Sequence, residues 1–68
     1  MANGELSNKD YDLISVVYHS SHGAELCDQF IADAEKEGDQ EAVQLFRETQ
    51  EHYLKLAQKG RNLLKNRL

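Results

Sequence analysis

Apolar and small residues recur every three or four positions over most of the chain. In the first half their spacings are 4, 3, 4, 3, 4 and 3, which places the side chains on one face of a helix. The pattern predicts a long amphipathic helix over about 8–37. Its expected core face consists of Leu13, Val17, Ser20, Ala24, Cys27, Ile31 and Ala34.

Capping signals bound this helix. Ser7 can accept a hydrogen bond from the backbone three residues later, whereas residues 1–6 carry no pattern and are expected to fray. Gly38 can adopt the left-handed conformation that ends a helix, and Asp39 can cap the next one. A turn is therefore predicted at 38–39.

The second half repeats the rhythm and predicts a helix over about 40–66. The expected core face is Ala42, Phe46, Thr49, Tyr53, Leu56, Gly60 and Leu63, widened by Leu45, Ala57 and Leu64. Two such faces joined by a short turn predict an antiparallel hairpin, within one domain spanning 1–68.

The hairpin register follows from the two faces, because facing residues in an antiparallel pair have numbers with a constant sum. Here the sums are 76 or 77, and large residues face small ones: Tyr53 faces Ala24, and Gly60 leaves room for Val17. A break at 20–23 is the alternative, but the unbroken stripe favours one continuous helix.

A second apolar stripe suggests that the hairpin pairs with another copy. The first helix carries apolar residues on two faces, and the second helix of the hairpin can cover only one of them. Packing of a second hairpin on the other face would give a homodimeric four-helix bundle. The predicted interface consists of Tyr11, Ile14, Tyr18, Val43, Leu54 and Leu68.

Charge adds an orientation to this dimer. The net charge is −4, all twelve acidic residues lie at or before Glu51, and five of the eight basic residues lie from Lys55 onward. Antiparallel pairing of two hairpins would place the basic C-terminal end of each hairpin against the acidic turn of the other. The overall negative charge argues against nucleic acid as a partner.

The chain has neither a long apolar run nor a signal-peptide pattern, so no membrane association and a cytoplasmic location are expected. Cys27 is the only cysteine, which excludes an intrachain disulfide and a multi-cysteine metal site. It is interpreted as a small core residue, with a redox or intermolecular role as the alternative.

Possible metal ligands are the remaining candidates for chemistry. His19, His22 and Glu25 are spaced three apart on the first helix, and Glu48 and His52 lie on the second. All five residues are expected to be structural or solvent-exposed rather than metal ligands. Glu25 and His52 are expected to form a salt bridge or hydrogen bond with each other. A phosphotransfer role for His19 is a further alternative. No nucleophile with a pocket or phosphate-binding loop appears, so neither catalysis nor a cofactor is expected.

The junction Asp33-Ala-Glu-Lys-Glu-Gly-Asp39, followed by Leu45-Phe-Arg-Glu48, resembles half of a ferritin-like bundle of the rubrerythrin type. The segment Tyr-Asp-Leu-Ile-Ser-Val-Val-Tyr-His at 11–19 is similar to that of small bacterial helical proteins. The resemblance covers roughly residues 10–64. It implies that the fold is a helical hairpin and that the protein is bacterial.

Ferritin-like di-metal sites require a Glu in one helix and Glu-x-x-His in the next. The resemblance places Ser20, Tyr53 and Leu56 at those positions, so these ligands are not retained. The expected function is non-enzymatic: a structural, adaptor or regulatory role through protein contacts. The alternatives are a metal-binding or redox protein with a displaced His/Glu site, and a monomer that presents its tyrosine face to a different protein.

Overall fold

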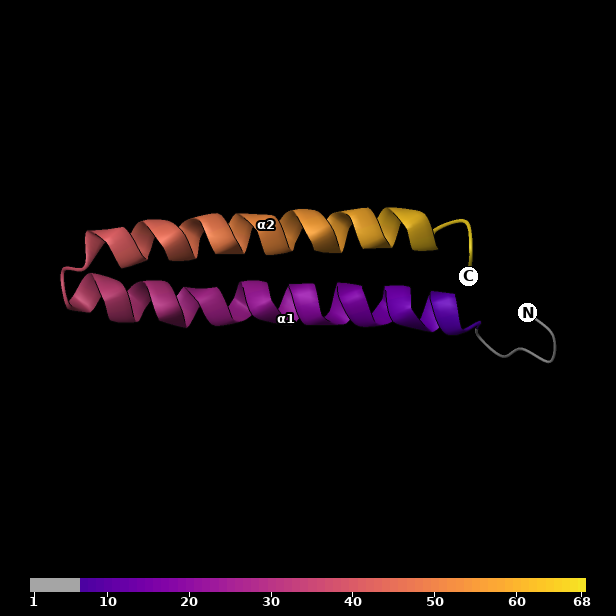
Figure 1. Cartoon of the computed structure of the whole chain (residues 1–68), viewed down its shortest axis with the longest axis horizontal. Helices are drawn as coiled ribbons and strands as arrows, with labels where there is room; N and C mark the ends of the chain where they lie inside the picture. Colours follow the sequence, from indigo (N-terminus) through magenta and orange to yellow (C-terminus); the bar gives the residue numbers. More distant parts are fainter. Residues whose placement is uncertain (1–6) are drawn as a thin grey trace.

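Two long antiparallel helices make up the fold, as expected for a proline-free chain rich in helix-forming residues. The computed structural model describes residues 7–68; the expected frayed segment 1–6 lies outside this range. Helix α1 spans Asn8–Lys36 and helix α2 spans Gln40–Leu64, and they lie side by side (Figure 1). The all-α hairpin prediction is confirmed, and α1 continues without a break through 20–23.

The expected capping residues take their predicted roles. The Ser7 side chain accepts from the Asp10 backbone N–H at 3.1 Å, and the Asp39 side chain accepts from that of Ala42 at 3.1 Å. Gly38 has φ +70°, and the N–H of Asp39 donates to the Ala34 carbonyl at 3.0 Å. The Ser7 bond satisfies a backbone donor at the start of α1, and the two bonds of Asp39 satisfy backbone groups on either side of the turn.

The expected face of α1 packs against α2. Ser20, Ala24, Cys27 and Ala34 are buried, and the other members of the face are half-buried. Asp10 extends the same face by one step and is also buried. Its Oδ1 atom has no hydrogen-bond partner among the described residues.

Close contacts between the helices reproduce the predicted register. A Cβ built on Gly60 would lie 2.5 Å from Cγ2 of Val17, and these residue numbers sum to 77. A Cβ on Gly23 would lie 2.8 Å from the ring of Tyr53, and the Phe30 and Phe46 rings are 5.6 Å apart; both pairs sum to 76.

The face that α2 presents differs in part from the prediction. Val43, Ala57 and Gly60 are buried, whereas Leu56 and Leu63 are each 48% exposed instead of lying in the core. The residues that face α1 are Val43, Phe46, Gln50, Tyr53, Ala57, Gly60 and Leu64. Phe46, Tyr53 and Gly60 were expected on the face, and Ala57 and Leu64 were expected at its edge. The expected Ala42, Thr49, Leu56 and Leu63 each lie one position before a residue that faces α1, so α2 is rotated relative to the prediction.

This rotation has a physical reason on the opposite helix. The middle of the α1 face is made of small residues, which allow the helices to approach closely where α2 also presents Ala57 and Gly60. The polar Gln50 is accommodated because its Nε2 donates to the Ala24 carbonyl and to the Asp28 carboxylate, both at 2.8 Å. Leucines at 56 and 63 are left at the edge.

The resulting core is narrow. The buried apolar residues are Ala24, Cys27, Ala34, Val43 and Ala57, and none of the leucines, isoleucines or aromatic residues described is buried. Hydrophobic stabilisation grows with the apolar area removed from water, so a core of this kind stabilises the hairpin only weakly.

Candidate protein-binding surface

The exposed surface of the hairpin divides into two flanks that differ in chemistry. On either helix, a residue just before a core-facing position lies on one flank, and a residue just after it lies on the other. Contacts between the helices agree with this assignment. Glu35 and Arg47, both just after core-facing residues, form an ion pair at 3.0 Å, and Phe30, just before one, contacts Phe46.

The first of these surfaces, here the apolar flank, carries most of the exposed large hydrophobic side chains. It is defined by Val16, Leu26, Phe30, Leu45, Leu56 and Leu63, six of the ten large hydrophobic residues that are exposed within residues 7–68. Ala42 and Thr49 lie between them on α2 and are half-buried. The apolar surface of α2 therefore includes both its core-facing residues and its part of the apolar flank. An apolar surface of this width is typical of a helix in a bundle, whereas a helix in a two-stranded coiled coil has a narrower one.

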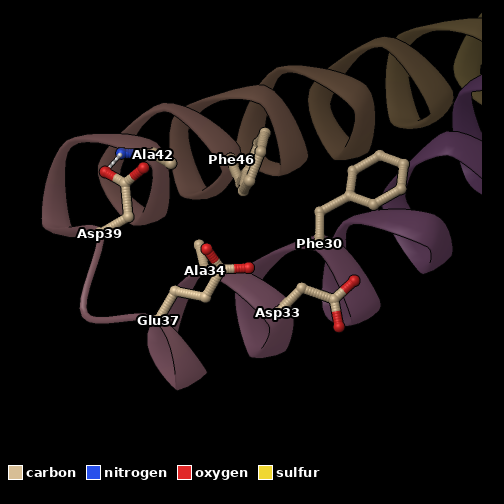
Figure 2. Close-up of a pocket in the computed structure, with 7 residues that line it drawn as sticks. All are labelled: Phe30, Asp33, Ala34, Glu37, Asp39, Ala42 and Phe46. Atoms are coloured by element: carbon tan, nitrogen blue, oxygen red, sulfur yellow. Dashed lines mark hydrogen bonds between the residues drawn. The ribbon is translucent and has the colours of Figure 1, made fainter.

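A hollow of about 270 Å³ opens on this flank next to the turn. Phe30, Ala34, Ala42 and Phe46 form its apolar part. Figure 2 shows Asp39 at the turn, with the carboxylates of Glu37 and Asp33 successively farther along the hairpin and Asp33 at about the level of Phe30. The hollow therefore combines an apolar floor with an acidic rim.

The other surface, here the polar flank, is laced with polar contacts. Besides the Glu35–Arg47 pair it carries the Gln50–Asp28 hydrogen bond, and Arg61 Nη2 donates to Gln58 Oε1 at 3.0 Å. A second hollow of about 290 Å³ lies here, and Ser21, Glu25, Asp28 and Arg61 supply polar groups to its lining. These side chains are already partnered or well solvated, so this flank gains less from being covered.

The interface residues expected from the sequence fall mainly on the polar flank. Tyr11, Tyr18 and Leu54 are exposed there, and Ile14 is half-buried. Leu68 is exposed beyond the end of α2. Val43 differs from the prediction because it faces α1 and is only 5% exposed. Its side chain is covered within the hairpin, which leaves it unavailable to a partner.

The expected metal-ligand candidates point in different directions. His19 and His52 lie on the apolar flank and Glu25 on the polar flank, while His22 and Glu48 face away from the opposite helix. Within residues 7–68, no three His, Cys, Asp or Glu side chains group so that they could hold a metal ion. The expected Glu25–His52 pair is not among the polar contacts of this range, because the two residues lie on opposite flanks.

Aromatic contacts involve two of these histidines. The Tyr18 ring stacks on His22 at 6.1 Å with a 9° interplanar angle, and it meets His19 edge-on at 5.3 Å. A packed ring explains the placement of His22 without a bound ligand.

The only thiol is enclosed by the hairpin. Burial raises the pKa of the Cys27 thiol, and the nearby Asp28 carboxylate adds to the increase. Both effects disfavour the thiolate, which is the nucleophilic and metal-binding form. Cys27 therefore acts as a packing residue in this structure.

The apolar flank and its hollow are the features that sequence reasoning missed. The signal was present, because apolar or small residues occupy adjacent pairs such as 42 and 43, 56 and 57, and 63 and 64. Such doublets broaden a helix face. The prediction centred the face on the first member of each pair and placed Ala57 and Leu64 at its edge, whereas in the structure the second member of each pair faces α1.

Comparison with known proteins does not extend this description. No protein-family model matches the chain, and no curated protein or solved structure matches it either. Across the described helices, none has a stretch long and apolar enough to cross a membrane.

Proposed function

We propose that this chain is a non-enzymatic protein-interaction module whose hairpin pairs with a second copy to form a four-helix bundle. The observation that carries the proposal is the contrast between a core of small residues and six exposed large hydrophobic residues on one flank. Isolated exposed hydrophobic residues are ordinary, but a contiguous group of this kind is typical of a protein-binding surface.

The pairing supplies what the hairpin lacks. A second layer would remove the exposed leucines and Phe30 from water, and apolar burial is the main source of stability in small helical folds. The bundle would then serve a structural, adaptor or regulatory role through its remaining surface.

The same proposal extends to relationship and location. A ferritin-like origin is supported by the helix-Glu37-Gly38-Asp39-helix junction, because hairpins of this kind form half of ferritin-like bundles. A cytoplasmic location is supported by a free, buried Cys27, since unpaired thiols suit a reducing compartment.

Light scattering and elemental analysis on one untagged sample test the function. We expect a mass of twice 7.8 kDa and no stoichiometric metal. A monomer at tens of micromolar would contradict the homodimer. A stoichiometric metal that is lost in both His22→Ala and His52→Ala would favour the metal-binding alternative instead.

A further inference from the structure

We infer that the second copy docks on the apolar flank, not on the tyrosine-bearing polar flank, and runs antiparallel so that its basic end covers the acidic-rimmed hollow. This inference rests on the proposed homodimer and specifies its face and orientation. It assigns the hollow at the turn as the binding site for the Val16/Leu63 end of the partner chain.

The two ends of the apolar flank have complementary shapes and polarities. At the turn end, the hollow offers Phe30 and Phe46 as an apolar floor. At the opposite end, the register brings Leu63 level with residues 13–14, near Val16, and both side chains are about half exposed. A hollow of about 270 Å³ can admit aliphatic side chains of this size.

Charge on the same flank sets the orientation. Asp33, Glu37 and Asp39 surround the hollow, whereas toward the other end the apolar flank carries Lys9, Lys59 and one carboxylate, Asp12, so that the end is net positive. In an antiparallel dimer each acidic rim faces the basic end of the other copy at both ends of the interface. In a parallel dimer the three carboxylates of one copy would face those of the other, which is unfavourable.

The two-fold axis of such a dimer passes near Gly23, midway between the level of Leu63 and the level of Ala42. These two residues are level with positions 13–14 and 34–35 of α1, so the apolar flank is about 30 Å long at the helical rise of ~1.5 Å per residue. Two helices packed side by side are roughly 20 Å wide. The face thus measures about 600 Å² per partner, and the ~1,200 Å² buried in total is the lower limit for a standard stable interface.

A pair of neighbouring leucines provides the test. Leu56 lies on the apolar flank and is 48% exposed, while Leu54 lies on the polar flank and is 55% exposed. They share residue type, helix and exposure, so Leu54→Glu is a matched control for Leu56→Glu. The measurement is solution mass by light scattering, with helicity from circular dichroism on the same samples.

We expect the Leu56→Glu protein to have the monomer mass and the Leu54→Glu protein to keep the dimer mass. A monomeric Leu54→Glu protein with a dimeric Leu56→Glu protein would overturn the inference but keep the homodimer. Equal masses for the two variants would also overturn it. A monomeric unmodified protein would refute the homodimer itself, so the two failures are distinguishable.

Cross-linking tests face and orientation without depending on the stability of a glutamate variant. In a Cys27→Ala background, single cysteines replace Leu54, Leu56 or Leu63, and a short bismaleimide is added. In the antiparallel dimer the two Leu56→Cys thiols lie ~10 Å apart along the axis and the two Leu63→Cys thiols ~30 Å apart. We expect efficient dimer cross-linking only for Leu56→Cys. Efficient cross-linking of Leu63→Cys would contradict the antiparallel orientation. Efficient cross-linking of Leu54→Cys would contradict docking on the apolar flank.

Discussion

Cys27 is the most deeply buried residue between the two helices. Its side chain is fully buried at the middle of a seam that also contains Ala24 and Ala57. A small, weakly polar thiol fits such a seam, because it fills space without requiring a hydrogen bond. The raised pKa is a consequence of that burial rather than a sign of reactivity.

This placement predicts a protected thiol. At pH 8 we expect Cys27 to react with a disulfide reagent at least about tenfold more slowly in the folded protein than in guanidinium, since ~1.4 kcal/mol of opening free energy slows reaction tenfold. Spectrophotometric thiol titration measures both rates. Equal rates would contradict the burial of Cys27.

The same shift has a consequence for stability. The folded state raises the thiol pKa, so it retains the proton above the unfolded value of ~8.5. Stability from the neutral thiol is therefore complete below that pH and decreases as pH rises toward the folded pKa. The stability difference between the unmodified protein and Cys27→Ala should shrink over this alkaline range.

At the level of the helices, close approach depends on glycines placed opposite bulky side chains. Gly60 leaves space for the branched side chain of Val17, and Gly23 leaves space for the Tyr53 ring. Val17 is the stiffer neighbour, because branching at Cβ restricts its rotamers, whereas the half-exposed Tyr53 ring can swing outward.

The packing at Gly60 predicts that the effect of Gly60→Ala on stability has opposite signs in the presence and absence of the Val17 side chain. Gly60→Ala should destabilise the protein by about 1 kcal/mol, because ~1–3 kcal/mol of overpacking against Val17 exceeds the ~1 kcal/mol gained in helix propensity. In a Val17→Ala background the same change should stabilise by about 1 kcal/mol. Denaturant unfolding of the four proteins forms a double-mutant cycle, and a stabilising Gly60→Ala in the unmodified protein would contradict the described contact.

The helices also show what the sequence determines locally and what it leaves to packing. The caps at Ser7 and Asp39 and the left-handed Gly38 were predictable, because each depends on the chemistry of a few adjacent residues. The face of α1 was predictable because its apolar residues follow a single stripe.

The orientation of α2 was not predictable in the same way. Its doublets fit two neighbouring stripes equally well, and the choice depends on the small residues of α1 and on hydrogen bonds from Gln50 to Ala24 and Asp28. The apolar flank is a direct result of that choice, since it receives the leucines that the core does not. For the same reason the sequence brought Glu25 and His52 together, whereas the structure separates them.

At the scale of the molecule, the hairpin combines a weakly stabilising core with a large apolar flank. In the proposed bundle these are two parts of one arrangement, in which small residues let the helices of each hairpin approach and large residues pack between hairpins. Folding and assembly are then coupled, so the stability of the hairpin depends on the concentration of a second copy.

Thermal unfolding across a hundredfold range of protein concentration tests this coupling most directly. If the hairpin is completed by a second copy, the melting temperature should rise by about 3–6 °C for each tenfold increase in concentration, since mass action adds ~1.4 kcal/mol per decade. A cooperative transition at the same temperature throughout would mean that the hairpin is stable alone, and would contradict the account.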